Sequence, residues 1–456
     1  MENIRRIALE TLMLAEREQA KSDKVLKDVL EKYSYLDNRE LSYLNRLVNG
    51  VIERKLELDY ITGCFSSVKP QRMKPAVRMI LRMGTYELLY MDSVPDHAAV
   101  SEAVRLVKGT GLKNLAGFVN GVLRSIARNR DGIVYPDRER DTAGYLSTVC
   151  SVPLHIVNLL LKELGEDTAE RVLREQLLPR PVFIRVNESR VTGEELGEEL
   201  LRAGIETTPA PYVSCALTVT SPEGLFESRP FKEGLFGVSD ISSMLAVCLS
   251  GVKKGDRVLD VCAAPGGKTC HVLDILDGSG EVVARDISPE KVSLIDENIK
   301  RQGFKGNVET QVLNALSVRE GDMGRFDVLL ADLPCSGLGV MGRKKDIKYR
   351  LSEDDLKLLS ELQRDILRAV SGYVRPGGIL MYTTCTIDSL ENEANYEFIK
   401  NELPFEPVAL SPLLPKELMN GTAESGYLQL LPGIHRSDGF FIAKFRRKDE
   451  GACYGK

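Results

Sequence analysis

The sequence lacks tryptophan altogether, holds only four histidines, and is poor in aromatic residues, which make up 6% of its 456 positions. Any planar stacking on a ligand must therefore come from tyrosine, phenylalanine or arginine. No stretch approaches the ~18 apolar residues of a membrane-spanning helix. The apolar N-terminus is interrupted by Glu2 and Glu10 and has no small-residue cleavage site, so it does not fit a signal peptide. We expect a cytoplasmic protein that is neither secreted nor membrane-spanning.

Cysteine and histidine show no metal-binding pattern along the chain. The nine cysteines are an odd number, no C-x-x-C pair occurs, and the four histidines do not cluster with the cysteines. A disulfide framework or a zinc site is therefore not expected, which fits a reducing compartment. Free cysteines are usually inert core residues, so a catalytic role has to be argued for each one separately. We expect no bound metal.

An excess of positive charge is also missing, since 61 basic residues stand against 66 acidic ones. The distribution is uneven: residues 1–140 hold 24 basic and 19 acidic residues, an excess of +5, and the remainder carries −10. A basic N-terminal third is compatible with a polyanion-binding module joined to a different domain. Ordinary variation of surface charge explains the same numbers equally well, so charge alone does not decide.

Residues 1–140 are predicted to form a helical domain. Asp96 can cap a helix that follows Pro95 and has an apolar stripe on one face, and the segment 77–90 is apolar on most sides, as in the central helix of a bundle. A segment with Gly, Pro and dense charge, residues 132–141, is predicted to be a linker. The glycines expected to allow close helix contacts are Gly50, Gly84 and Gly121.

Residues 141–235 are predicted to form a helical connection followed by a small α/β module. After the helical patterns, residues 181–187 (PVFIRVN) alternate like a strand. Thr192 and Glu195 have the spacing of a capping box that starts a helix, and residues 216–220 are a second candidate strand.

Residues 236–448 are predicted to form a doubly wound α/β domain. From about residue 251 onward, apolar strand patterns alternate with helical ones, which is typical of a parallel sheet with helices on both faces. The predicted strands are 257–262, 281–286, 308–313, 326–332 and 378–382. A final strand at 440–445 (FFIAKF) is expected to be antiparallel at one edge of the sheet.

The first candidate site is the turn DVCAAPGGKT, residues 260–269, after the first strand of this domain. Ligands of open α/β sheets bind at the carboxyl ends of the strands, and small residues let the backbone approach them closely. The turn is not a phosphate loop, because Cys262 stands where the first glycine of that motif would be. Asp286 ends the second strand, a suitable position for accepting hydrogen bonds from both ribose hydroxyls. A structural turn beside a surface aspartate is the alternative.

Two further motifs follow neighbouring strands. DLPCSG, residues 332–337, ends the fourth strand, and TTCT, residues 383–386, ends the fifth. A lone cysteine is more often inert than catalytic, but Cys335 and Cys385 are both predicted to lie at the sheet edge that carries the first turn. The convergence of three motifs at one edge predicts a catalytic site with at least one reactive cysteine.

These motifs point to a family. DVCAAPGGKT, DLPCSG and TTCT resemble the signature motifs of the RNA cytosine-5 methyltransferases that use S-adenosylmethionine. PDHAAVSEAV and FVNGVLRSIAR resemble the antitermination factor NusB. With the closing PGIHRSDGFFIAKF, nearly the whole chain resembles the bacterial RsmB (Sun/Fmu) family, whose members methylate a cytosine of 16S rRNA, the cytosine-967 type. The resemblance implies an all-α NusB-like RNA-binding domain at 1–140, an RRM-like module within 141–235, and a Rossmann-like methyltransferase domain at 236–448.

The resemblance also implies roles for individual residues. Cys385 is the expected nucleophile, Cys335 assists the release step, and Asp332, held neutral by burial, donates a proton to N3 of the cytosine. Lys268 is expected to steady the base or the cofactor. The residues implied in binding S-adenosyl-L-methionine are Cys262, Ala263, Ala264, Pro265, Gly266, Gly267, Lys268, Asp286, Asn314 and Asp332.

The implied partner is 16S rRNA, free or in an early assembly state, with no membrane and no metal, and the protein is expected to act as a monomer. The chain departs from the usual family pattern at Ser239, where glutamine is common, and at Lys345, where proline is usual. Basic residues after the second motif could hold phosphates beside a flipped nucleotide, and a solvated charged loop is the alternative. These residues are Arg343, Lys344, Lys345, Lys348 and Arg350.

Other targets and another class of function stay open. The substrate could be transfer RNA, another ribosomal cytosine, or DNA, whose enzymes use a Pro-Cys dipeptide that would favour Cys335 as nucleophile. The NusB-like region argues for RNA. A non-catalytic RNA-binding or assembly factor with a vestigial catalytic half is the alternative of a different class. The residues that argue against it are Asp286, Asp332, Cys335 and Cys385.

Overall fold

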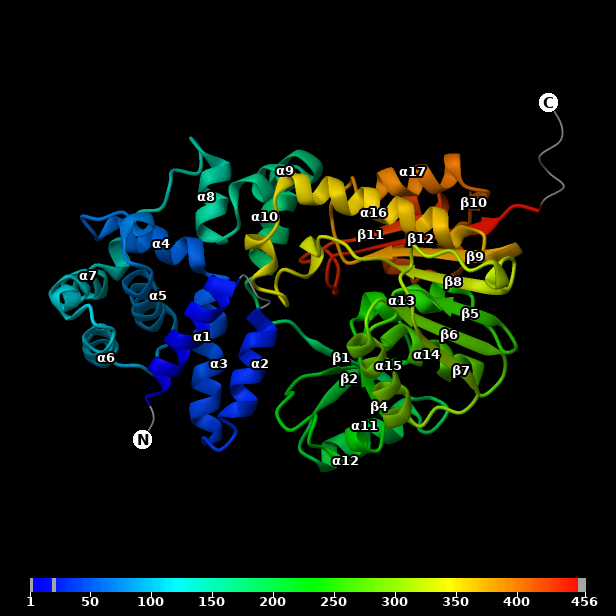
Figure 1. The fold of residues 1–456 in the computed structure, drawn as a ribbon, viewed down its shortest axis with the longest axis horizontal. Coiled ribbons are helices and arrows are strands. Elements are labelled where there is room, and N and C mark those ends of the chain that lie inside the picture. The colour runs from blue at the N-terminus through cyan, green and yellow to red at the C-terminus, as the bar shows by residue number, and fades with distance from the viewer. Residues whose placement is uncertain (1–2, 19–21, 450–456) are drawn as a thin grey trace. The chain divides into compact units, whose positions relative to one another are not determined.

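The computed structural model describes residues 3–18 and 22–449, and the chain divides into two compact units (Figure 1). Glu2, which interrupts the apolar N-terminus, lies outside the described residues. Unit 1 consists of Met1–Leu178 and Met341–Leu351, and unit 2 of Pro179–Val340 and Ser352–Lys456. The segment Met341–Leu351 therefore folds with a part of the chain that comes far earlier in the sequence.

Unit 1 is helical over its described residues, as the hydrophobic pattern predicts. Its helices are α1 Ile4–Glu18, α2 Ser22–Lys32, α3 Asn38–Glu53, α4 Lys55–Cys64, α5 Pro75–Tyr90, α6 Asp96–Gly109, α7 Ala116–Arg128, α8 Thr142–Val149, α9 Leu154–Leu164 and α10 Glu166–Glu175. Asp37 and Asp141 cap α3 and α8, because their side chains accept backbone N–H groups that have no partner within the helix.

Helix α5 is central to the bundle because it is apolar on most of its surface and largely buried. Gly84 of α5 permits a close approach of α7, since a Cβ at this position would lie 2.7 Å from Leu123. Gly50 of α3 faces the ring of Tyr86 in the same way. The expectation for Gly121 is wrong, because no atom of the described residues lies within 4 Å of the position its Cβ would take.

The segment Met341–Leu351 is fastened to unit 1 by buried polar contacts. Lys348 is 2% exposed, and its Nζ donates to the backbone oxygen of Glu53 at 2.9 Å, an oxygen that also accepts the hydroxyl of Tyr349 at 2.9 Å. Lys345 forms an ion pair with the Glu53 carboxylate at 3.2 Å. The expectation that Lys348 holds an RNA phosphate is therefore wrong, because its ammonium is buried against protein oxygen, and Lys345 is already paired.

No single helix in the described part of the chain is long and apolar enough to cross a membrane. Helices α8 and α9 reach such a length and composition only when taken together, and a bend of 119° separates them.

The N-terminal part of unit 2 is a small α/β module. Its strands are β1 Val182–Val186, β2 Thr207–Pro209, β3 Ala216–Val219 and β4 Phe236–Val238, and its helices are α11 Gly193–Arg202 and α12 Arg229–Lys232. The strands pair antiparallel in the order β2-β3-β1-β4. The predicted capping box starts α11: the Thr192 side chain accepts the N–H of Glu195, and the Glu195 side chain accepts the N–H of Thr192. Ile184, Leu196 and Leu200 belong to a core that lies between this sheet and α11.

The rest of unit 2 is built on a larger mixed sheet with the strand order β10-β12-β9-β8-β5-β6-β7 (Figure 1). The parallel strands are β5 Arg257–Asp260, β6 Glu281–Asp286, β7 Asn307–Val312, β8 Phe326–Asp332 and β9 Val374–Thr384. The antiparallel strands are β10 Phe405–Pro407, β11 Tyr427–Leu430 and β12 Phe440–Arg447. The strand predicted at 440–445 is antiparallel as expected, but its predicted edge position is wrong, because β12 lies between β9 and β10.

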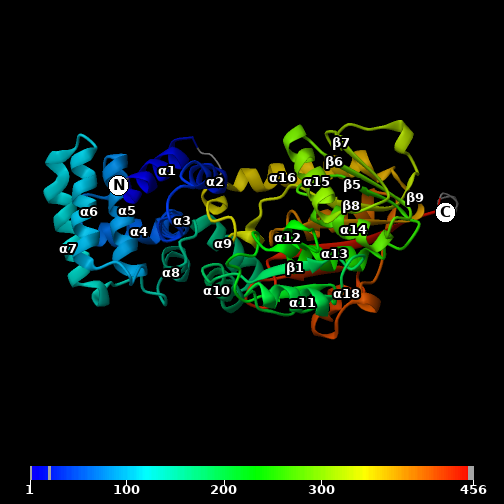
Figure 2. The ribbon, with the colours of Figure 1, turned by 90° about the horizontal axis from the view of Figure 1, so that it is seen from below.

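Helices cover both faces of this sheet, with α13, α14 and α15 on one face and α16 and α17 on the other (Figures 1 and 2). Their bounds, with that of the short α18, are α13 Ile241–Ser250, α14 Gly267–Leu276, α15 Pro289–Gln302, α16 Glu353–Ser371, α17 Glu393–Glu402 and α18 Gly421–Glu424. Successive strand residues alternate between the faces: Val282 and Ala284 pack with α13–α15, and Val283 packs with α16 and α17. This confirms the doubly wound fold and brings the carboxyl ends of the parallel strands to one edge.

A buried ion pair joins the small module to the helices of the larger sheet. Arg185 of β1 pairs with Asp274 of α14, and the two side chains are 2% and 4% exposed. The Arg185 Nη2 also donates to Oε1 of Gln302 in α15 at 2.6 Å. Asp274 accepts the backbone N–H groups of Glu188 and Ser189 at 3.0 and 2.9 Å. Strand β1 is therefore fixed to α14 and α15 by polar groups that are nearly out of contact with water.

Replacing Arg185 should destabilise unit 2. Arg185→Met leaves the Asp274 carboxylate buried without its cation, a loss of about 3–5 kcal/mol in comparable buried pairs. Urea titrations measure the free energy of unfolding. Arg202→Met is the control, because Arg202 pairs with Glu198 while 71% exposed, and a surface pair contributes at most about 1 kcal/mol. Equal effects of the two substitutions would contradict the role given to the buried pair.

The buried Lys348 should make the stability of unit 1 depend on pH. Burial lowers the pKa of Lys348 from 10.5 to about 8, so the unfolded chain binds more protons than the folded chain between these values. The contribution of this group to stability is lowest below about pH 8 and rises by up to about 3 kcal/mol as the pH increases through that window. Lys348→Met should remove this rise and stabilise the protein below about pH 8 by about 1–3 kcal/mol. Tyr349 would still satisfy the Glu53 oxygen.

Urea unfolding of wild type and Lys348→Met at several pH values measures this difference. Lys344→Met, at an exposed position of the same segment, controls for the loss of a lysine there. A difference between wild type and Lys348→Met that stays constant with pH would show that Lys348 does not titrate as a buried group.

Candidate active site

The turn between β5 and α14 is shaped by a glycine. Gly266 has a φ of 99°, in the left-handed region, and precedes the first residue of α14. A Cβ at Gly266 would lie 3.2 Å from the Cα of Ile295 in α15, so the backbone conformation would be strained by a side chain and the space is tight. The Gly266 N–H donates to the backbone oxygen of Ala263 at 2.6 Å, which tightens the turn. Residues 262–268, predicted to bind the cofactor, thus form a compact turn at the carboxyl end of β5.

Asp286, at the end of β6, is held against this turn. It is 3% exposed, and its Oδ2 accepts the N–H of Ala264 at 3.0 Å. Its Oδ1 accepts the N–H of Ile287 at 2.7 Å and the Nζ of Lys291 at 2.8 Å. The structure therefore brings Asp286 and the turn together. Each carboxylate oxygen has two lone pairs, so Oδ2, which accepts one N–H, can still accept a hydrogen bond from a ribose hydroxyl, whereas Oδ1 already accepts two.

Asn314 lies two residues beyond the end of β7. The N–H of the preceding Leu313 donates to the backbone oxygen of Asp286 at 2.9 Å, which places this segment beside the end of β6. Asn314 is exposed, and its Oδ1 accepts the N–H of Leu316 at 3.0 Å in a local turn. Its contact with an adenine amino group stays a prediction, with one lone pair of Oδ1 already engaged.

Asp332, at the end of β8, is paired with Lys268 from the start of α14. The Lys268 Nζ lies 2.6 Å from the Asp332 Oδ2, and the Thr383 hydroxyl donates to the Asp332 Oδ1 at 2.8 Å. The Asp332 side chain is 32% exposed. The expected reason for a neutral Asp332, burial, is therefore not met, because the carboxylate has a cation and solvent beside it. Lys268 also donates to the hydroxyl of Ser243 at 3.2 Å.

Asp260, at the end of β5, is the carboxyl group that burial does affect. Burial raises the pKa of Asp260 to about 7. The Thr269 hydroxyl donates to its Oδ2 at 2.8 Å, and no described residue provides a hydrogen-bond partner for its Oδ1. Near neutral pH this carboxyl is therefore partly protonated, which limits the negative charge gathered at the strand ends.

The two motif cysteines are brought into contact although 50 residues separate them in the sequence. The Sγ atoms of Cys335 and Cys385 lie 3.2 Å apart as free thiols, and the backbone N–H of Cys385 donates to the Cys335 Sγ at 3.3 Å. The hydrogen bond to Cys385, together with burial, raises the pKa of Cys335 well above its usual value. Cys335 therefore keeps its proton, and the pair is suited to hold a negative charge on Cys385.

A buried carboxylate ties the two cysteine loops together. Glu391 is fully buried and accepts the N–H of Ser336 at 3.0 Å and the Nε2 of Gln363 at 2.7 Å. Burial raises the pKa of Glu391. The hydroxyls of Ser336 and Thr386 lie 2.7 Å apart, which links the residues that follow Cys335 and Cys385 directly.

The sequence patterns predicted no role for Asp260 or Glu391, although both residues lie in or near the motifs. Asp260 opens the first motif, so its place at the strand end was visible, but its burial was not. Glu391 follows Cys385 by six residues in a polar stretch, IDSLEN, that precedes α17. Such a stretch is typical of an exposed loop, and only the fold shows that α16 covers it.

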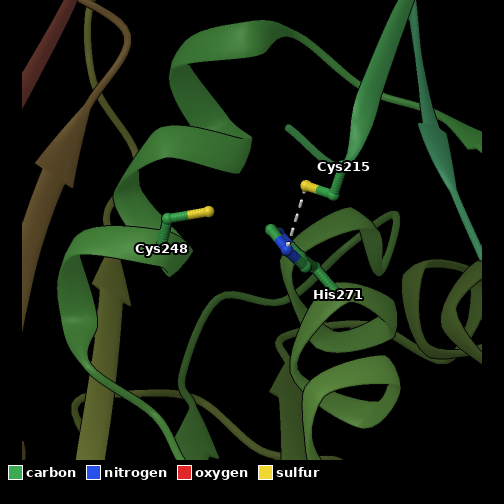
Figure 3. Close-up of side chains that lie close together, drawn as sticks. All are labelled: Cys215, Cys248 and His271. Carbon is green, nitrogen blue, oxygen red and sulfur yellow. Dashed lines mark hydrogen bonds between the residues drawn. The ribbon is translucent and has the colours of Figure 1, made fainter. Parts of the chain in front are cut away.

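Cysteine and histidine residues that are far apart in the sequence meet at one place in the fold. Cys215, Cys248 and His271 are well separated in the sequence, but their side-chain ligand atoms all lie within 4.8 Å of one another (Figure 3). One histidine, His271, therefore lies with two cysteines in unit 2, in a group that does not include Cys335 or Cys385.

Comparisons with protein families cover nearly the whole chain. The model described as 16S rRNA methyltransferase RsmB/F matches residues 247–446, and the NusB family model matches residues 2–128. The ferredoxin-like domain of RsmF/B-like methyltransferases matches residues 152–225, which include α9 and α10 of unit 1 and most of the small module. The matches agree with the predicted order of a helical domain, a small α/β module and a methyltransferase domain.

Individual relatives agree with the family models. A probable ribosomal RNA small subunit methyltransferase B of Bacillus subtilis is 37% identical over 449 residues, covering 98% of this chain and 99% of the relative. The ribosomal RNA small subunit methyltransferase B of Klebsiella pneumoniae is 30% identical over 447 residues, covering 98% of each. Among solved structures, PH0851 has a TM-score of 0.80 at 25% identity and covers 98% of this chain and 99% of its own. NSun6 from Pyrococcus horikoshii with SFG has a TM-score of 0.59 at 24% identity and covers 65% and 99%. The chain belongs to the 16S rRNA methyltransferase RsmB/F family and is an S-adenosyl-L-methionine-dependent methyltransferase.

Proposed function

We propose that this enzyme transfers a methyl group from S-adenosyl-L-methionine to C5 of one cytosine in 16S rRNA, of the cytosine-967 type, through a covalent bond between Cys385 and C6. The observation that carries the proposal is the contact of Cys335 and Cys385 at 3.2 Å, at the sheet edge that also holds the turn 262–268 and Asp332. The names of the relatives supply the substrate class, since those proteins are ribosomal RNA small subunit methyltransferases.

The cofactor is proposed to lie across the ends of β5 and β6. Asp286 would accept a ribose hydroxyl through Oδ2, and the tight turn at 262–268 lets the ligand approach the backbone. Asn314 would face the adenine from the segment after β7. The bound cofactor would supply the methyl group, and the cysteines that would act on the base lie after β8 and β9 of the same sheet.

Cytosine C5 is a poor nucleophile, and covalent catalysis makes it more reactive. Addition of a thiolate to C6 makes C5 enamine-like, which divides one difficult step into two easier ones. Only a few per cent of a cysteine with its ordinary pKa of ~8.5 is thiolate at neutral pH. The Cys335 S–H can hydrogen-bond to the Cys385 sulfur, so the thiolate is stabilised on Cys385, the proposed nucleophile.

The ion pair of Lys268 and Asp332 is proposed to neutralise the negative charge that develops on the base. Attack at C6 pushes negative charge onto N3 and O2, and a proton donated at N3 neutralises it. Asp332 is ion-paired with Lys268 at 2.6 Å, so the proposed donation to N3 is a relay in which Lys268 gives a proton to Asp332 as Asp332 gives one to N3. After methyl transfer, the C5 proton must leave and the C6–S bond must break. Cys335, in contact with Cys385, is proposed to assist this elimination.

The target base must leave its stack, which costs a few kcal/mol unless it lies in a loop. Phosphate contacts in unit 1 are proposed to contribute RNA affinity. A groove of ≈ 760 Å³ between α6 and α7 is lined by cations. They are Arg105, Lys108, Arg124 and Arg128. Among the ion pairs of the described residues, none involves Lys108 or Arg124, so both are available to an anion.

Substitution of the two cysteines should give opposite results. Cys385→Ala should lower methyl transfer by at least about 1,000-fold and abolish any covalent protein–RNA adduct, because the nucleophile is lost. Cys335→Ala should still attack and transfer the methyl group but stall before release. This variant should accumulate an adduct that survives denaturing gel electrophoresis and disappears after RNase treatment.

The matched control is Cys64→Ala, which removes an exposed thiol of unit 1. RNA containing 5-fluorocytosine sharpens the test, since fluorine cannot leave as a proton does, and wild type should then be trapped as well. An adduct in Cys385→Ala but not in Cys335→Ala would reverse the assignment and favour the arrangement of the DNA enzymes.

Charge reversal in the groove of unit 1 should weaken RNA binding without affecting cofactor binding. Lys108→Glu/Arg124→Glu removes two proposed phosphate contacts, so the slope of log K against log salt should fall by about 1.4 for a single strand. Arg140→Glu, an 88% exposed arginine of the same unit outside the groove, is the control. Point substitutions are preferable to removing residues 1–140, which would also strip Met341–Leu351 of its packing partner. Equal salt slopes for the groove variant and wild type would refute the proposed contacts.

A further inference from the structure

Cys215, Cys248 and His271 come from three different elements of unit 2 (Figure 3). Cys215 immediately precedes β3 of the small module, Cys248 lies in α13, and His271 lies in α14. The Cys215 Sγ is 3.6 Å from the Nε2 of His271, and all three ligand atoms lie within 4.8 Å of one another. Figure 3 shows the two sulfur atoms and the imidazole ring converging on one space between these elements.

The distances fit a tetrahedral metal site. Zinc binds thiolate sulfur at about 2.3 Å and imidazole nitrogen at about 2.0–2.1 Å, so a tetrahedral ion would separate sulfur from nitrogen by about 3.6 Å and two sulfurs by about 3.8 Å. The Cys215–His271 distance already has this value. A small side-chain rotation would bring the Cys248 sulfur to the remaining distance, since it starts within 4.8 Å of both other atoms.

The donors are held in place by the fold. Cys215 and His271 are 6% and 4% exposed. The backbone oxygen of Cys215 accepts the N–H of Val186 in β1 at 2.8 Å, which anchors this residue to the small module. Cys248 reaches the surface, so an ion has a route of entry.

The charges and hydrogen bonds are consistent with an ion. Two thiolates balance a divalent cation, so the filled site would be neutral, as a largely buried position requires. Without an ion, the cluster makes only weak thiol contacts, of which the Cys215 Sγ–His271 Nε2 contact at 3.6 Å is one.

We propose that Cys215, Cys248 and His271 bind one zinc-type transition-metal ion, with water in the fourth position. Soft sulfur and imidazole donors select such ions over magnesium or calcium. The ion would fasten β3 of the small module to α13 and α14. His271 lies one helical turn after Lys268, so the site would also fix the helix that carries the Lys268–Asp332 ion pair.

Metal titration of the full-length protein, stripped with a chelator and kept reduced, tests the proposal. Cobalt(II) should bind at one equivalent per chain with the absorption of tetrahedral thiolate coordination, and zinc should displace it. Cys248→Ser should weaken binding by more than about 100-fold, since loss of even an outer-shell partner costs about 10–100-fold. Cys270→Ala, which removes the buried thiol next to His271 but outside the cluster, should bind as wild type does.

The cysteine pair of the active site is a competing thiolate site and needs its own variant. Cys335→Ala/Cys385→Ala should keep the full equivalent of metal. Loss of binding in this variant, or its persistence in Cys248→Ser, would overturn the proposal. Formation of a Cys215–Cys248 disulfide by a wild-type protein that binds no metal would overturn it as well.

A second measurement does not depend on the folding of a variant. Zinc should protect Cys215 and Cys248 of wild type from alkylation, located by mass spectrometry, and should leave the exposed Cys64 reactive. Alkylation of Cys248 at the same rate with and without zinc would contradict the site. None of these readouts requires methyl transfer, so they stand apart from the proposed RNA chemistry.

Discussion

The Glu391 carboxylate is the contact on which the geometry of the cysteine pair depends. Cys335 and Cys385 lie on different loops, after β8 and β9, and no covalent bond joins them. Glu391 accepts the N–H of Ser336, the residue next to Cys335, and lies six residues beyond Cys385 on the other loop. Because Glu391 is fully buried, releasing either of its partners would leave a polar group without a hydrogen bond, at a cost of about 1–3 kcal/mol for each group.

This carboxylate belongs to a network that reaches into the core of the large domain. Gln363 of α16 donates to Glu391 and accepts from the hydroxyl of Tyr382 at 3.0 Å and the Nδ2 of Asn395 at 2.7 Å. Tyr382 is part of β9, the strand that delivers Cys385, and Asn395 is part of α17. The loops are therefore supported by a strand and two helices at once, so the 3.2 Å approach of the sulfur atoms follows from the fold and not from the loops alone.

Patterns of neighbouring residues predicted the features of the fold that depend on neighbouring residues. The period of apolar residues gave the helices of unit 1 and the parallel strands, and the ends of those strands gave the meeting of the turn 262–268, Asp332 and the two cysteines. The predictions that were wrong concern features that depend on residues far away in the sequence. The internal position of β12 is set by its pairing with β9 and β10, and the burial of Lys348 is set by Glu53, almost 300 residues earlier. A lysine in a charged loop carries no sign of such a partner.

Three aspartates lie at the strand ends of the large sheet, and the negative charge of each is compensated in a different way. The Asp286 carboxylate accepts two backbone N–H groups and forms an ion pair with Lys291, and Asp332 forms an ion pair with Lys268. Among the described residues, Asp260 has no ion-pair partner. Burial raises its pKa to about 7, so it is partly protonated near neutral pH. Three unpaired carboxylates at this edge would oppose a thiolate on Cys385 by like-charge repulsion. With two carboxylates paired and the third partly protonated, the edge can hold the one negative charge that the proposed attack on cytosine requires.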